Sequence, residues 1–253
     1  MVNASLDAIE TLVATGRLGA RLVVVSEQGR GETAVIDENG DVLAGRLPEP
    51  APEGMLSDLT QLMDRERSET LAYGNLEIYL ETIAPQPRLV IFGAVHIGQE
   101  LTALATRLGY RVVVSDARPA FLTGERFPQA EQLALGWPDE VEVAFDRRTF
   151  VVVLSHDARF EDPLWPRLLP ANVAYIGAMG SRKTAARRRQ RLLEAGYTPE
   201  QVDRIHGPIG LPIGAVAPGE VALAILAEMT KSRYRTEEPL QLVGSVRLLG
   251  RDE

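Results

Sequence analysis

The sequence predicts an α/β protein, with a small N-terminal α+β domain followed by a Rossmann-like domain built on a doubly wound parallel sheet. Three observations support this prediction. Apolar and polar residues alternate over 75–83, as in a half-buried strand, and Asn39-Gly40 is a strong hairpin signal. Beyond residue 88 the strand-like segments are continuous apolar runs that alternate with helical patterns, which is typical of a sheet covered on both faces. The two prolines of "APQPR" (84–88) disfavour helix and mark the boundary between the two patterns.

The N-terminal domain, residues 1–84, is expected to contain two helices and a mostly antiparallel sheet. Its first helix is indicated by apolar residues three or four positions apart, from Leu6 to Val13, and by a stop near Gly16. In chain order the expected elements are a helix at 5–16, a strand at 20–28, a hairpin at 32–45, a helix at 54–66 and a strand at 75–83.

The second domain, residues 85–234, is expected to alternate strands with helices. The strands are predicted near 89–93, 111–115, 149–154 and 172–176, and the helices near 97–108, 160–169, 181–195 and 218–231. The segment "RIHGPIGLPIGA" (204–215) has two prolines and three glycines, which predicts a rigid loop rather than a helix or strand. Residues 235–253 form a C-terminal tail to which the pattern assigns no element.

Composition narrows the function classes. Residues 1–84 contain 6 Lys and Arg against 15 Asp and Glu, whereas the rest of the chain contains 21 against 20. An acidic first domain argues against nucleic-acid binding, because phosphate contacts need cations. No run of about 18 apolar residues exists, so we expect no membrane span, and the N-terminus lacks the basic region of a signal peptide. There is no cysteine, which excludes disulfides and thiolate chemistry and is compatible with the cytoplasm.

The turn in "LVIFGAVHIGQE" (89–100) has the layout of a dinucleotide-binding turn, with a strand, a glycine bend and a helix that begins near His96. Gly93 and Gly98 match the first and third glycines of G-x-G-x-x-G, which make the bend and allow close helix packing. Val95 replaces the second glycine, so its branched side chain should hold a diphosphate away from the helix. Asp116 ends the next strand, where an acid usually binds ribose hydroxyls.

A second glycine turn, in "YIGAMGSRKTAARRRQRLLEAG" (175–196), is predicted to bind an anion. Gly177 and Gly180 precede a helix that Ser181 is placed to cap, and free N–H groups at a helix N-terminus favour negative charge. Arg182 in the first helical turn opposes the helix dipole unless an anion lies beside it. A solvent-exposed helix face is the favoured interpretation of the later arginines, Arg187, Arg188, Arg189 and Arg191.

Two more segments carry candidate ligand contacts. Ser155 and His156 follow a strand at its carboxyl end, where ligands bind in open α/β sheets, but no G-x-S-x-G elbow accompanies them. The 204–215 loop, which includes His206 and Gly210, is placed to line a ligand crevice. The three histidines lack metal-ligand spacing, so no metal site is expected.

These segments together resemble the XdhC/CoxI family, the accessory proteins of xanthine dehydrogenase and related molybdenum hydroxylases. The matching stretches cover most of residues 89–230 and read "GAVHIGQELTALATRLGYRVVVSDAR", "VVVLSH", "YIGAMGSRKTAARRRQRL" and "IHGPIGLPIGAVAPGEVALAILAE". The resemblance implies a homodimeric chaperone with a Rossmann domain that binds molybdenum cofactor (molybdopterin), protects it during sulfuration and delivers it to an apo-enzyme. This chain departs from the family's usual G-A-G-H turn at Val95 and lacks its usual N-terminal cysteine, so no thiol of its own serves as a molybdenum ligand.

The first expectation is therefore a non-catalytic accessory protein of the cytoplasm. Its partners would be a molybdenum hydroxylase apo-enzyme, a sulfur-donating desulfurase and a second copy of itself, and the cofactor's phosphate would lie near the Gly93 turn and residues 177–182. Two alternatives stay open. One is an NAD(P)-binding oxidoreductase, which Val95 disfavours and which would place His96 or His156 beside the nicotinamide. The other is an interaction module that has kept the fold without a ligand.

Overall fold

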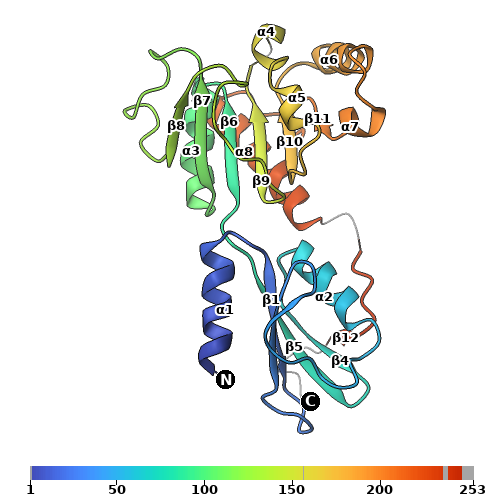
Figure 1. The fold of residues 1–253 in the computed structure, drawn as a ribbon. Coiled ribbons are helices and arrows are strands. Elements are labelled where there is room, and N and C mark those ends of the chain that lie inside the picture. The colour runs from blue at the N-terminus through green and yellow to red at the C-terminus, as the bar shows by residue number, and fades with distance from the viewer. Residues whose placement is uncertain (1, 156, 236–238, 247–253) are drawn as a thin grey trace. The chain divides into compact units, whose positions relative to one another are not determined.

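The computed structural model describes residues 2–155, 157–235 and 239–246. The described residues form two compact units, one from those up to Pro85 together with those from Tyr234 onward, and one from those of Gln86–Arg233 (Figure 1). In the described part of the chain, no helix is both long and apolar enough to cross a membrane.

The first unit is built on an antiparallel sheet. Its strand order is β12-β4-β5-β1-β2-β3, and the Asn39-Gly40 turn joins β2 and β3 as predicted. Buried side chains of α2, including Met55, Leu59 and Leu62, pack on the inner face of the sheet. The elements are α1 (Val2–Ala14), β1 (Gly19–Val24), β2 (Thr33–Asp37), β3 (Val42–Gly45), α2 (Met55–Asp64), β4 (Glu69–Tyr73), β5 (Leu76–Ile83) and β12 (Ser245–Val246).

The described part of the C-terminal tail belongs to this first unit. Strand β12 pairs antiparallel with β4, and Asp58 of α2 accepts hydrogen bonds from the N–H groups of Val243 and Gly244, each at 2.8 Å. The sequence pattern assigned no element to the tail, because β12 is only two residues long and its partners lie far away along the chain.

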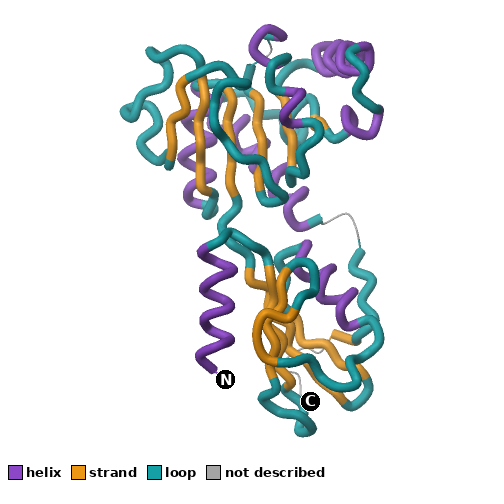
Figure 2. Tube along the Cα trace, in the orientation of Figure 1, coloured by secondary structure: helices purple, strands orange, loops and turns teal. Residues whose placement is uncertain are grey.

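The second unit contains a six-stranded sheet in the order β11-β10-β9-β6-β7-β8, and every neighbouring pair is parallel. When these strands are renumbered in chain order, the sheet is 3-2-1-4-5-6, the order of dinucleotide-binding Rossmann domains. The predicted fold class is therefore confirmed. The strands are β6 (Arg88–Phe92), β7 (Arg111–Asp116), β8 (Gln132–Leu135), β9 (Thr149–Val153), β10 (Tyr175–Ala178) and β11 (Ile205–His206) (Figure 2).

Helices cover both faces of this parallel sheet. One apolar cluster joins the sheet to α3 and α8, and a second joins it to α5, α6 and α7. Burial on both faces explains why the strands read as continuous apolar runs. The helices are α3 (His96–Arg107), α4 (Ala158–Glu161), α5 (Trp165–Leu168), α6 (Arg182–Glu194), α7 (Pro199–Asp203) and α8 (Pro218–Tyr234).

The structure differs from the sequence prediction in short elements. The helix expected at 160–169 is two separate turns, α4 and α5, since Pro163 between them lacks the N–H that a continuous helix needs. Strand β11 lies within 204–215, so the prediction that this segment contains no strand was wrong. The pattern also missed β4, β8 and α7, each of five residues or fewer.

Candidate functional site

The Gly93 turn has the geometry of a Rossmann ligand turn. Gly93 has a φ of +119°, and a Cβ atom there would lie 3.2 Å from Cβ of Leu154, at the end of the neighbouring strand. A Cβ on Gly98 would lie 3.0 Å from the Gly93 carbonyl oxygen. Gly93 therefore makes the bend and Gly98 lets α3 approach β6 closely, while their contact with a ligand stays a prediction.

A crevice opens at the carboxyl ends of β6 and β9. The chain leaves β6 toward β7 on one side of the sheet and returns to β9 on the other, so this is the switch point at which open α/β sheets bind ligands. The cavity has a volume of about 460 Å³, within the range of cofactor sites. Four predicted residues line it, namely Gly93, Val95, Asp116 and Ser155. The lining also includes Asp157, which follows Ser155 and His156 at the same strand end, and Arg118, Trp137, Arg159 and Phe160, which the sequence pattern did not single out.

Asp116 is already engaged by protein groups. Its side chain is only 2% exposed, and it accepts hydrogen bonds from the Ala94 N–H at 2.7 Å and from the Arg118 N–H, Nε and Nη2 at 2.8–2.9 Å. Burial raises the pKa of Asp116, but these hydrogen bonds and the Arg118 charge outweigh it and hold the pKa below its usual value. Asp116 is thus a charged, fully paired group, and binding a ribose diol would require it to give up these partners.

The other predicted residues of this turn differ in their access to the crevice. Val95 caps α3 with an extended backbone and offers no side-chain hydrogen bond to the helix. His96, the first residue of α3, is exposed and is not among the residues that line the cavity. Ser155 Oγ accepts a hydrogen bond from the Asp157 N–H at 3.1 Å. His156 lies outside the described residues.

Arginine and aromatic side chains form the walls of the crevice. Arg159 pairs with Asp157 through Nε and Nη2, at 3.1 and 2.7 Å. The rings of Trp137 and Phe160 lie 5.9 Å apart between centroids, tilted by 46°. Guanidinium groups suit phosphates, and aromatic faces suit flat rings, so these walls can hold a ring compound that carries phosphate.

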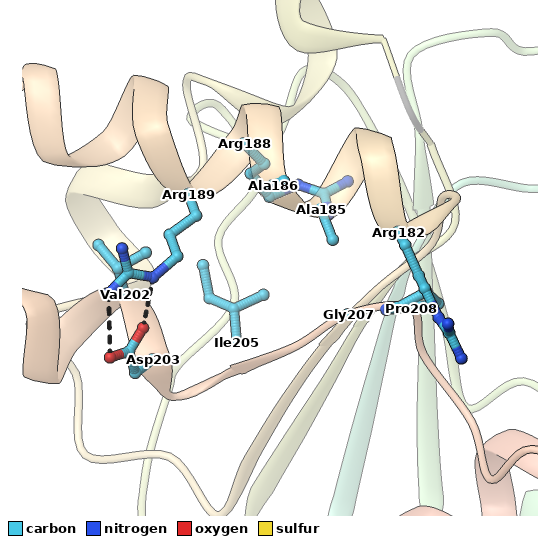
Figure 3. Close-up of a pocket in the computed structure, with 10 residues that line it drawn as sticks. All are labelled: Arg182, Ala185, Ala186, Arg188, Arg189, Val202, Asp203, Ile205, Gly207 and Pro208. Carbon is cyan, nitrogen blue, oxygen red and sulfur yellow. Dashed lines mark hydrogen bonds and ion pairs between the residues drawn. The ribbon is translucent and has the colours of Figure 1, made fainter.

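The second predicted turn opens onto a separate groove along α6, drawn in Figure 3. Gly180 has a φ of +140°, and the Ser181 side chain caps α6 by accepting the Thr184 N–H at 3.2 Å. Arg182 is exposed and lines this groove, whose volume is about 310 Å³, together with Gly207 and Pro208. Of the residues predicted to share one ligand, Arg182 lines this groove and not the crevice, and Gly177, Gly180 and Ser181 line neither of the two cavities, so a shared ligand stays a prediction.

Two predicted glycines have close neighbours, while their contact with a ligand stays a prediction. A Cβ on Gly177 would lie 2.4 Å from Ile209 Cδ1 and 2.6 Å from Tyr175 Oη. Gly210 has a φ of +94°, and a Cβ there would lie 3.2 Å from the Ala224 side chain. The φ of Gly210 favours glycine, and a Cβ at Gly177 would force the Ile209 and Tyr175 side chains to shift, because the 205–210 segment packs tightly on β10 and α8.

Behind these glycines lies a polar cluster centred on Glu228. Glu228 accepts hydrogen bonds from the Tyr175 hydroxyl and from the Gly210 N–H, and His206 Nδ1 lies 3.6 Å from its other oxygen. The rings of Tyr175 and His206 are 4.7 Å apart between centroids. Burial raises the pKa of Glu228, yet the proximity of His206 and the hydrogen bonds from Tyr175 and the Gly210 N–H prevail and lower it below the usual value.

The predicted exposure of the α6 arginines was wrong for Arg188. Its side chain is 3% exposed and donates to both oxygens of Glu161, at 2.8 and 2.7 Å, and to the Met179 carbonyl at 2.8 Å. The neighbouring Arg189 is exposed and pairs with Asp203 of α7, as Figure 3 shows. A buried arginine on a basic helix cannot be told from its neighbours until its carboxylate partner, 27 residues earlier, is known.

Among the described residues no group of histidines and carboxylates is arranged to hold a metal ion. The sequence did contain a signal for the arginines of the crevice, since Asp-Ala-Arg occurs both at 116–118 and at 157–159. Each copy lies at the carboxyl end of a strand that flanks β6.

Comparisons with known proteins assign most of the second unit to a family. A family model described as the XdhC Rossmann domain matches residues 89–229. A probable xanthine dehydrogenase subunit from Bacillus subtilis (strain 168) is 35% identical over 160 residues, which are 62% of this chain and 46% of that protein. The molybdenum cofactor insertion chaperone PaoD of Escherichia coli (strain K12) is 28% identical over 194 residues, which are 76% of this chain and 55% of that protein. The chain thus spans about half the length of these curated relatives.

The overall fold also has a solved counterpart. A crystal structure of a xanthine dehydrogenase from Bacillus halodurans matches with a TM-score of 0.55 at 18% sequence identity, covering 95% of this chain and 98% of that one. At this level of identity the match shows similarity of fold alone.

Proposed function

Because this chain belongs to the XdhC family, we propose that it binds molybdenum cofactor and assists its insertion into a molybdenum hydroxylase of the xanthine dehydrogenase type. Its relatives include a protein named as a molybdenum cofactor insertion chaperone and one named as a probable xanthine dehydrogenase subunit. In this proposal the cofactor is cargo, and the chain itself carries out no reaction.

The observation that carries the proposal is the crevice at the switch point of the parallel sheet. Its volume of about 460 Å³ is suitable for a small cofactor. The pterin of the cofactor contains a flat pyrimidinone ring, which suits the aromatic side chains of Trp137 and Phe160 that line the cavity. The phosphate of the cofactor matches the guanidinium groups of Arg118 and Arg159, which line the same cavity. The residues present therefore fit the group.

The chain offers no ligand for the metal itself. It has no cysteine, so a sulfur atom reaching the cofactor would have to come from a partner, for which a sulfur-donating desulfurase is the natural class. Binding would then protect the cofactor through burial of its ring and phosphate. We expect the protein to act as a homodimer in the cytoplasm and to dock on the apo-enzyme that receives the cofactor.

NAD(P) binding is the second candidate, and two features argue against it. Val95 stands where the turn of dinucleotide-binding proteins needs a glycine for close approach of the diphosphate. Asp116, in the position of the ribose-binding acid, is saturated by Arg118 and the Ala94 N–H. An NAD(P)-dependent oxidoreductase would need a glycine at position 95 and an Asp116 carboxylate that is free to bind the ribose.

The test is to purify the protein without oxygen from cells that make molybdenum cofactor. We expect molybdenum and a pterin to be present by metal analysis and mass spectrometry, and transfer to an apo-hydroxylase to restore its activity. Tight, low-micromolar binding of NADPH by calorimetry, with no molybdenum copurified, would reject the proposal in favour of the second candidate.

A further inference from the structure

The same three-residue arrangement occurs twice in the crevice. In Asp116-Ala117-Arg118, the carboxylate accepts the Arg118 N–H at 2.9 Å, Nε at 2.9 Å and Nη2 at 2.8 Å. In Asp157-Ala158-Arg159, the corresponding distances for Arg159 are 3.0, 3.1 and 2.7 Å. We call these two triplets the Asp-Ala-Arg clamps. Each clamp fixes the guanidinium plane of its arginine relative to its own backbone.

The two clamps lie on opposite sides of the Gly93 turn. The first is at the end of β7 and the second follows β9, and these are the two strands that pair with β6. Both arginines line the same cavity. Their side chains are 54% and 87% exposed, whereas the Asp116 carboxylate lies buried behind Arg118. A ligand that enters the crevice therefore meets the Arg118 guanidinium before it meets this carboxylate.

The paired arginines retain donors for a ligand. Each clamp uses Nε and Nη2, so among the described residues no hydrogen bond engages Nη1 of Arg118 or of Arg159. The Arg118 guanidinium also stacks on the Phe121 ring, 4.3 Å from its centroid. An arginine that is already oriented loses less conformational entropy when it binds a phosphate.

We propose that the two Asp-Ala-Arg clamps are the phosphate-binding groups of the crevice, so that Arg118 and Arg159 both donate hydrogen bonds to the phosphate oxygens of a ring compound held there. The identity of that compound as molybdenum cofactor rests on the proposed function, whereas the recognition of phosphate by the clamps does not. The clamps replace the usual mode of the fold, in which a glycine at the position of Val95 brings the diphosphate onto the helix N-terminus.

The experiment measures ligand binding by anaerobic calorimetry with three single variants. Arg118→Gln and Arg159→Gln each remove one clamp, and each should weaken binding of molybdenum cofactor about 10-fold or more, the usual effect of losing a hydrogen bond to a charged group. Arg189→Gln is the matched control, because Arg189 forms the same kind of bidentate pair with Asp203 outside the crevice. It should leave affinity unchanged. Arg118→Lys provides a second test, since it keeps the charge beside buried Asp116 but loses the planar fork.

Each outcome decides a different point. If the wild type binds the cofactor and both Gln variants bind equally well, the clamps are not the phosphate site, although the proposed function stands. If the wild type ignores the cofactor but binds NADPH or ATP in a way that needs both arginines, the proposed function fails and the clamps are upheld. If all three variants, Arg189→Gln included, lose affinity alike, general electrostatics explain the binding and the inference is overturned.

Discussion

The crevice at the Gly93 turn and the groove along α6 both present arginines paired with carboxylates, yet the pairs are built differently. In the crevice each arginine pairs with an aspartate two residues earlier, and its guanidinium remains exposed toward the cavity. On α6 the partners come from other elements, α4 for Arg188 and α7 for Arg189. A local pair orients a side chain for a ligand, whereas a pair between elements fastens those elements together. Packing therefore explains Arg188 and Arg189, whereas anion binding at Arg182 stays a prediction.

The largest effect is expected from removing the buried ion pair on α6, which tests whether pairs between elements stabilise the fold. Arg188→Ala leaves Glu161 buried without its hydrogen-bonded partner and with only the more distant Arg191, at 3.6 Å, which should reduce the free energy of unfolding by up to about 3–5 kcal/mol. Urea unfolding followed by circular dichroism measures the change. Replacing both residues, as in Arg188→Met with Glu161→Leu, should recover most of the loss because no unpaired charge remains.

The matched control is the neighbouring Arg189→Ala, which removes an exposed pair with Asp203 and should hardly move the unfolding midpoint. If Arg188→Ala reduced the free energy of unfolding as little as Arg189→Ala, the interpretation that the Arg188–Glu161 pair holds α6 on α4 would be wrong.

A second test concerns Gly177, which the sequence predicted to face an anion. Gly177→Ala would place a Cβ against Ile209 and Tyr175, so it should destabilise the protein by about 1–3 kcal/mol through overpacking. The same change should leave cofactor affinity in the folded protein unaltered. Gly124→Ala is the control, since a Cβ there meets open space, and its thermal midpoint should be unchanged or slightly higher. Loss of affinity without loss of stability in Gly177→Ala would restore the ligand role of this turn.

The architecture of the second unit could be predicted from the sequence. Strands buried on both faces require continuous apolar runs, and a tight turn requires glycines. Gly93, Gly98 and the order of strands and helices follow from those constraints. The short strands β8, β11 and β12 were not readable, since two to four residues carry no periodicity and their pairing depends on distant partners.

The sequence predicted the site less well than the fold, for reasons that three examples illustrate. Gly177 looks like a ligand-approach glycine until Ile209 is seen to fill the space beside it. Burial of Arg188 depends on Glu161, which no local pattern indicates. The Asp-Ala-Arg clamps were visible as a repeated triplet, but a triplet acquires meaning only when both copies lie on one cavity, and that requires the strand order of the sheet.

A third prediction concerns Val95, whose side chain we expect to limit NADPH binding in the crevice. Val95→Gly removes the side chain that narrows the approach to the N-terminus of α3, so NADPH should bind up to about 10-fold more tightly, equivalent to about 1.4 kcal/mol. Calorimetry on wild type and variant measures the difference. Unchanged NADPH binding would mean that saturation of Asp116, rather than Val95, keeps dinucleotides out.

The smallest expected effect is on the pH dependence of stability. The pKa of Glu228 lies below its usual value of 4.5 in the folded protein, because the proximity of His206 and the hydrogen bonds from Tyr175 and the Gly210 N–H outweigh burial. A carboxyl group whose pKa is lowered on folding stabilises the folded state fully above its unfolded pKa, and that contribution disappears as pH falls through the lowered folded value. Glu228→Gln should therefore be less stable than wild type at pH 7, with a difference that shrinks below about pH 4.5. Urea unfolding at pH 7, 5, 4 and 3 gives the two curves. Parallel curves over this range would show that the charge of Glu228 is unimportant and that only its hydrogen bonds hold the 205–210 segment on α8.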